Sequence, residues 1–185
     1  MSGSGPEVAV LAAGLALAGA ILVARWIWEH LAPPVPLRAA RVYISWARSG
    51  LTARDRLVEA LRPAVDAGRV VVHHDREVRS GQPWDQRLHP RVHDADLYVV
   101  LLTPDWLRDP LCRGRERPIW EPRVERGRAR VLLLQLHATD LREPALARLP
   151  LHPPSGRPLS RPGRELSERE AAALVPVVLA AAGRS

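Results

Sequence analysis

Residues 97–103 read LYVVLLT, an apolar and aromatic run whose last residue is a threonine. It lacks the polar alternation of a strand with one face in water and is typical of a strand buried on both faces. Three other short runs are similarly rich in leucine or β-branched residues, at residues 42–46, 70–73 and 131–136. Together these runs predict the strands of a buried parallel sheet.

Stretches with helical spacing separate these runs. The first covers residues 52–67, and others are predicted at residues 84–93, within 105–126 and at 167–182. In the last of these, Ser167 and Glu170 have the spacing of a capping box, which marks a helix start. Parallel strands need crossover connections, usually helices, so the alternation predicts an α/β fold with a doubly wound parallel sheet.

The composition bounds the size and the environment of the protein. A chain of 185 residues has room for one ordinary domain and an anchor. The net charge is +7, and the arginines that produce it are scattered rather than gathered in a basic arm. A solvated basic surface is therefore favoured over nucleic-acid binding. The single cysteine, Cys112, allows no internal disulfide, which fits a reducing compartment.

Residues 8–24 form an unbroken run of apolar and small residues, and two tryptophans lie just beyond it. Extended to residue 28, the run is long enough to cross a bilayer, with the tryptophans at its interface. We therefore predict a short extracytoplasmic N-terminus (residues 1–7), a transmembrane helix (8–28), a proline-rich linker (29–40) and a folded domain (41–185). A cleaved signal peptide is the main rival, but residues 1–7 carry no positive charge. A buried core helix is a second rival, although the run has no polar face.

Arginine placement predicts the orientation of this helix. No arginine precedes it, whereas Arg25, Arg38, Arg41 and Arg48 follow its apolar run. The positive-inside rule then places the C-terminal domain in the cytoplasm, on a single-pass protein of the inner membrane.

A ligand site is expected outside the carboxyl ends of the strands, where the strand order reverses. The loops after Trp46, His74 and Thr103 are the first candidates. None has the glycine spacing of a dinucleotide fingerprint or a P-loop. Conventional dinucleotide chemistry and P-loop chemistry are therefore disfavoured. His89 and His93 are four residues apart, but Pro90 lies between them and no third ligand is evident, so we predict no metal site.

These loops carry an ordered set of motifs. RVYISW at residues 41–46 is an apolar strand ending in Ser45 and an aromatic residue. DREVRSGQPW at residues 75–84 starts acidic and ends in tryptophan, and TPDWL follows the third strand at residues 103–107. Cys112 precedes Glu116 by four residues, and further motifs lie at residues 130–136 and 140–150. Over residues 41–182 this order resembles the TIR (Toll/interleukin-1 receptor) domain, which implies a flavodoxin-like fold.

The resemblance implies an activity, because many bacterial TIR domains cleave NAD+ at the nicotinamide–ribose bond. The glutamate on which they depend corresponds here to Glu116, and NAD+ would be the substrate with no further cofactor. Ser45, Trp46, Arg48 and Asp75 would line the binding site. Trp46 would stack on a ring of NAD+ and Arg48 would face the pyrophosphate.

The resemblance also implies partners and a context. TIR domains usually act when assembled, so we expect self-association through the loop at residues 75–84. Membrane lipid and other TIR or sensor proteins are further expected partners. A signalling or antiphage defence role in a bacterium follows from the same resemblance.

Three alternatives stay open at this point. Glu116 could be a solvent-facing glutamate, and Pro118 suggests that the helix starts there, leaving Glu116 just before it. The domain could be a catalytically inactive interaction module, which a Glu116 side chain pointing away from Trp46 and Arg48 would favour. A receiver-like domain would need an aspartate at the end of the third strand, where Thr103 lies.

Overall fold

The computed structural model describes residues 38–74, 90–160 and 164–184. These residues form a five-stranded parallel sheet with the strand order β2-β1-β3-β4-β5. The strands are β1 (Ala40–Ser45), β2 (Val70–His73), β3 (Leu97–Leu102), β4 (Arg130–Gln135) and β5 (Leu151–His152). This order is that of flavodoxin-like folds. The strand order reverses at β1, because β2 lies on one side of β1 and β3 lies on the other. The predicted fold class is confirmed.

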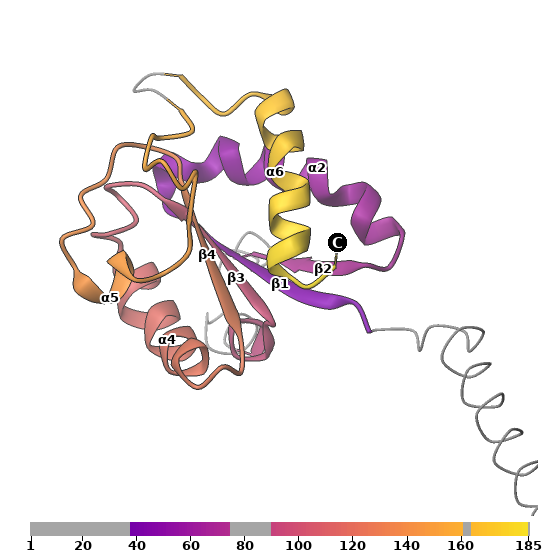
Figure 1. The fold of residues 1–185 in the computed structure, drawn as a ribbon, viewed down its shortest axis with the longest axis horizontal. Helices are drawn as coiled ribbons and strands as arrows, with labels where there is room; N and C mark the ends of the chain where they lie inside the picture. Colours follow the sequence, from indigo (N-terminus) through magenta and orange to yellow (C-terminus); the bar gives the residue numbers. More distant parts are fainter. Residues whose placement is uncertain (1–37, 75–89, 161–163, 185) are drawn as a thin grey trace, which may run out of the picture. The chain divides into compact units, whose positions relative to one another are not determined.

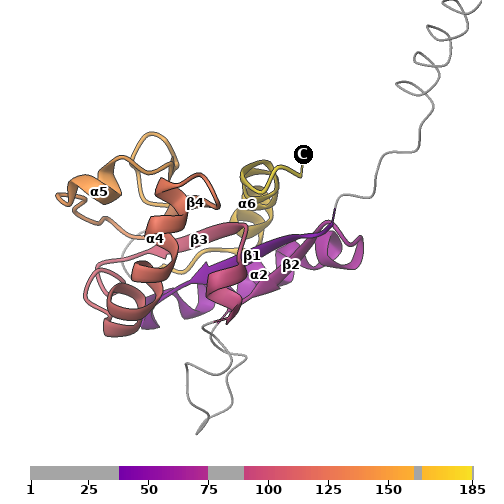
Figure 2. The same ribbon diagram turned by 90° about the horizontal axis from the view of Figure 1, so that it is seen from below.

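Helices cover both faces of the sheet (Figures 1 and 2). α2 (Leu51–Asp66) and α6 (Glu168–Ala181) pack on one face, while α4 (Arg117–Glu125) and α5 (Pro144–Ala147) pack on the other. Two shorter segments complete the set, the 3-10 turn η1 (Arg48–Gly50) and the π-helical turn η3 (Cys112–Glu116). Residues 90–94 are also helical and overlap the end of the helix predicted at 84–93, whose first residues lie outside the described ranges.

Two buried clusters follow from the alternation of side chains along the strands. Val42 and Ile44 of β1 belong to the cluster under α2 and α6, and Tyr43 belongs to the cluster under α4 and α5. All six residues of β3 are buried, which confirms the central strand predicted from its sequence. The sheet therefore separates two side-chain layers, and a residue's position along β1 determines which layer it joins.

Glycine ends two of the helices and turns the chain into the next strand. Gly68 and Gly127 have φ values of +67° and +65°, which favour a residue without a Cβ. After Gly68, the Arg69 N–H donates to the Ala64 carbonyl, which closes the end of α2 before β2 begins. The capping box at the start of α6 is present as predicted, with Ser167 and Glu170 bonded reciprocally.

The helix predicted within residues 105–126 is present, and the alternative that it starts at Pro118 is wrong. Helical residues run without a break from 110 to 125, so Glu116 lies inside the helix rather than before it. The chain accommodates Pro118 by forming η3, in which the Arg117 N–H donates to the Cys112 carbonyl five residues earlier. β5 was also missed, because two residues are too short to stand out as an apolar run.

The predicted membrane helix and linker fall largely outside the described ranges. Among the residues that are described, no helix is long and apolar enough to cross a membrane.

Candidate functional site

Glu116 places a carboxylate in the buried layer under α4. It is the last residue of η3, and the residue is only 2% exposed. The Tyr43 hydroxyl donates to Oε1 at 2.6 Å, and the Ser45 hydroxyl donates to Oε2. Both donors come from β1, two residues apart and therefore on the same face of the strand. Glu116 is thus fixed at the carboxyl end of β1, beside the point where the strand order reverses.

The π-helical turn explains how Glu116 reaches β1. A π turn holds an extra residue compared with an α turn, and such turns are frequent at functional sites. Pro118 has no N–H for the carbonyl of Gly114, four residues earlier, so ordinary α-helical bonding is interrupted there. Cys112 and Trp120, on either side of this interruption, are both fully buried. The turn therefore lets the helix bury residues on both sides of the proline and still aim Glu116 at the sheet.

Ser45 is bonded on its other side as well. The Trp106 indole Nε1–H donates to the Ser45 Oγ at 2.8 Å, and Trp106 is fully buried. Trp106 lies in the turn after β3, within the motif at residues 103–107. The Trp106 indole, the Ser45 hydroxyl and the Glu116 carboxylate thus form one continuous chain of hydrogen bonds. This chain links the turn after β3, the end of β1 and the π-helical turn. Sequence reasoning predicted Ser45 and Glu116 for the site but not Tyr43 or Trp106, which look like ordinary core residues.

Cys112 packs next to these groups. Its thiol donates to the Trp46 carbonyl at 3.3 Å. Burial raises the pKa of the Cys112 thiol, and the charges of Glu116 and Asp109 raise it further, so the thiol stays protonated. A protonated, buried thiol is a poor nucleophile. Cys112 therefore serves as a packing residue beside Glu116.

Trp46 and Arg48 do not join Glu116 in this structure. The Trp46 ring packs on the opposite layer, under α2, where the Arg54 guanidinium lies 4.1 Å from the ring centroid. Arg48 is exposed in η1. Asp75 lies outside the described residues. Of the predicted site residues, the structure therefore brings together Ser45 and Glu116.

An ion-pair cluster fixes the helix just beyond Glu116. The Arg117 guanidinium bonds Glu143 at 2.5 Å and Glu121 at 2.8 Å. These contacts, above all the hydrogen bond to Glu143, raise the pKa of Arg117, and the guanidinium in turn lowers the pKa of Glu143. Arg117 is 7% exposed, so the pairs lie partly out of water. The cluster ties the segment before α5 to the helix that carries Glu116.

A cavity of about 270 Å³ opens on the other layer of the sheet. Its lining includes Ala53, Leu136 and Leu166, which belong to the cluster under α2 and α6, and Glu116 is not part of it. Within the described ranges, no group of three or more metal-ligating side chains is placed to hold an ion.

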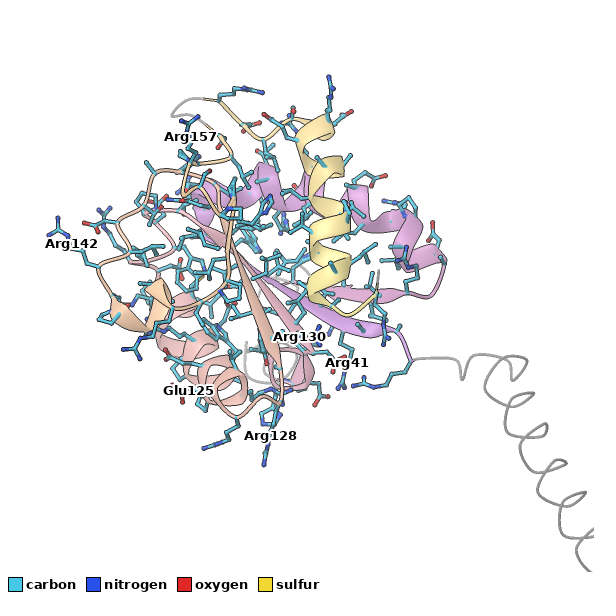
Figure 3. All side chains as sticks on the ribbon, in the orientation of Figure 1. Arg41, Glu125, Arg128, Arg130, Arg142 and Arg157 are labelled. Carbon is cyan, nitrogen blue, oxygen red and sulfur yellow. The ribbon has the colours of Figure 1, made fainter. Side chains whose placement is uncertain are left out.

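The positive charge is dispersed over the surface. Arg128, Arg142 and Arg157 point outward from well-separated parts of the domain (Figure 3). Several other arginines are paired with carboxylates, among them Arg38 with Asp96 at 2.7 Å.

Comparison with known proteins identifies the family. No curated protein matches the chain. The model of the TIR domain family matches residues 42–156, which runs from β1 past β5 and includes Glu116, Ser45 and Trp106. The strand order and the ordered motifs agree with this match, and the chain belongs to the TIR domain family.

Proposed function

We propose that this TIR domain cleaves NAD+ at the nicotinamide–ribose bond, with Glu116 as the catalytic carboxylate. The observation that carries the proposal is the position of Glu116, buried at the carboxyl end of β1 and held by two hydroxyls. A buried carboxylate is costly, and apolar residues of similar volume often stabilise a core as well or better. A role in stability alone therefore explains Glu116 poorly, whereas a functional role explains both the residue and its location.

The chemistry suits a single fixed carboxylate. When the bond between the ribose C1′ and the nicotinamide nitrogen breaks, its electron pair passes to the nitrogen and neutralises the pyridinium. The leaving group then needs no acid, and positive charge develops on the ribose. A carboxylate beside the ribose stabilises that charge. A water oxygen then bonds to C1′ and releases a proton to solvent, giving ADP-ribose.

The proposal includes a change of state. Glu116 is 2% exposed, so substrate can reach it only after the groups around it move. We propose that side-by-side assembly of TIR domains produces this opening. We also propose that residues 8–28 anchor the chain in the inner membrane, which would concentrate cytoplasmic domains for assembly in a signalling or defence response.

The test uses the full-length chain reconstituted in liposomes at increasing surface density. Nicotinamide release should rise with density, and Glu116→Gln should lower it about 100-fold or more, the scale expected for loss of a key electrostatic group. Glu125→Gln is the matched control, because Glu125 is an exposed glutamate of the same helix. The proposal fails if wild type leaves NAD+ intact while an active TIR domain consumes it under the same conditions.

A second candidate is a catalytically inactive module that recruits partners by TIR–TIR contact. The orientation of Trp46 favours it, because the ring faces the layer opposite Glu116 and is covered by Arg54. In that case Glu116→Gln leaves self-association unchanged, as measured by crosslinking in liposomes, and no variant or density produces nicotinamide.

A further inference from the structure

We infer that Trp106 is a positioning residue, which directs the Ser45 hydroxyl proton onto Glu116. A serine hydroxyl has one proton to donate, and it can accept through its lone pairs. The indole N–H only donates, and at 2.8 Å it occupies an acceptor site on the Ser45 Oγ. The single Ser45 proton is then left for the carboxylate, where the structure places it. Trp106 thereby controls the catalytic step, a consequence that rests on the proposed NAD+ cleavage.

The turn after β3 holds Trp106 rigidly in this role. The Trp106 backbone N–H donates to the Thr103 Oγ1 at 3.2 Å, and the Ser49 hydroxyl donates to the same oxygen at 3.0 Å. Thr103 and Trp106 are both fully buried. The motif TPDWL at residues 103–107 therefore fixes the indole against β1.

A second buried tryptophan shows that this bond is not a general result of burial. Trp120 lies in the same cluster and is also fully buried, yet its Nε1–H has no hydrogen-bond partner within the described structure. Among the three tryptophans in the described ranges, Trp46 likewise lacks a partner for its Nε1–H. Trp106 alone of these has an indole N–H directed at a hydroxyl that donates to Glu116.

Two substitutions separate positioning from packing. Trp106→Phe keeps most of the ring and loses the N–H, and Trp120→Phe makes the same change where no hydrogen bond is lost. In the reconstituted full-length chain, Trp106→Phe should lower kcat about tenfold with little change in KM, because the carboxylate is misplaced rather than the substrate site altered. Trp120→Phe should leave kcat within about twofold.

The decisive comparison is made in the Ser45→Ala background. If Trp106 acts through Ser45, Trp106→Phe adds no further loss of kcat once the hydroxyl is gone. If the two losses multiply, Trp106 does not act through Ser45 and the inference is overturned. Ser45→Thr, which keeps a hydroxyl, should restore the dependence on Trp106.

A measurement without NAD+ tests the same contact independently. In the full-length chain in detergent micelles, urea unfolding of single and double variants should show coupling between Trp106 and Glu116 that disappears in Ser45→Ala. Additive effects would overturn the positioning role even if the protein cleaves NAD+. Coupling in a protein that leaves NAD+ intact would support the contact and refute only the proposed function.

The contact can be followed even where Trp106→Phe folds poorly. Hydrogen exchange at the Trp106 indole, measured by NMR on labelled tryptophan, should become faster in Ser45→Ala while the Trp120 indole is unchanged. Equal exchange at Trp106 in wild type and Ser45→Ala would contradict the hydrogen bond.

Discussion

At the scale of single residues, Glu116 is held by two donors of the same strand. Tyr43 and Ser45 are two residues apart in β1, so both face the layer under α4. The sequence could have suggested this pairing, because the two hydroxyls share one face of a buried strand. The acceptor of these two hydroxyls could not have been predicted from spacing, since Glu116 is distant in the chain and reaches β1 only through the π-helical turn.

Tyr43→Phe tests the second donor. The substitution keeps the ring and removes the 2.6 Å hydrogen bond to Oε1 of Glu116, a buried residue. Loss of one partner from a buried charged group typically costs about 1–3 kcal/mol, so the free energy of unfolding should fall by about this amount in urea titrations. Tyr98→Phe is a matched control, because its hydroxyl donates to the Val92 carbonyl, away from Glu116. An unchanged midpoint for Tyr43→Phe would show that the contact contributes nothing.

At the scale of elements, the sequence predicted the strands better than the helix that carries the site. Buried parallel strands leave a plain signal in runs such as residues 97–103, and the capping box of α6 was equally readable. The prolines near Glu116 suggested a helix that starts at Pro118, because proline disfavours an α-helical interior. Proline is tolerated, however, where the hydrogen bonding shifts to a π turn. That shift depends on which residues the sheet can bury, which no local pattern contains.

Two glycines provide a prediction at this scale. Gly114 lies in η3 with ordinary backbone angles and open space where a Cβ would be, whereas Gly68 also has open space but a φ of +67°. Gly114→Ala should raise the free energy of unfolding by about 0.5–1 kcal/mol, because alanine has the better helix propensity. Gly68→Ala should lower it, since its backbone conformation is strained for alanine. Urea titrations of the two variants should therefore shift in opposite directions, and a destabilising Gly114→Ala would contradict the helical geometry of the π turn.

At the scale of the whole molecule, Asp96 links β1 to the start of β3. Burial alone would raise its pKa, but hydrogen bonds from the Arg41 backbone N–H, at 2.8 Å, and from the Arg38 side chain lower the pKa overall. A carboxyl group with a lowered folded-state pKa contributes stability above its unfolded pKa of about 4 and loses it as the pH falls below that value. Asp96→Asn should therefore be less stable than wild type at pH 7, and the difference should shrink toward pH 3 in urea titrations. A difference that is constant with pH would show that the charge of Asp96 plays no part.

The fold and the family are properties of the whole domain, and the sequence contained both in its ordered strands and motifs. The candidate site was predicted only in part. Ser45 and Glu116 come together, while Trp46 turns to the opposite layer because alternation along β1 sends successive side chains to opposite faces. Under the proposed function, Glu116 becomes accessible to NAD+ in the assembled protein.

Release of nicotinamide from NAD+ by the full-length chain, crowded on liposomes, tests that central claim most directly. We predict release by wild type and by Glu125→Gln, with release by Glu116→Gln reduced about 100-fold or more. Equal release by wild type and Glu116→Gln, or none from wild type at any density, would contradict the assignment of Glu116 as the catalytic carboxylate.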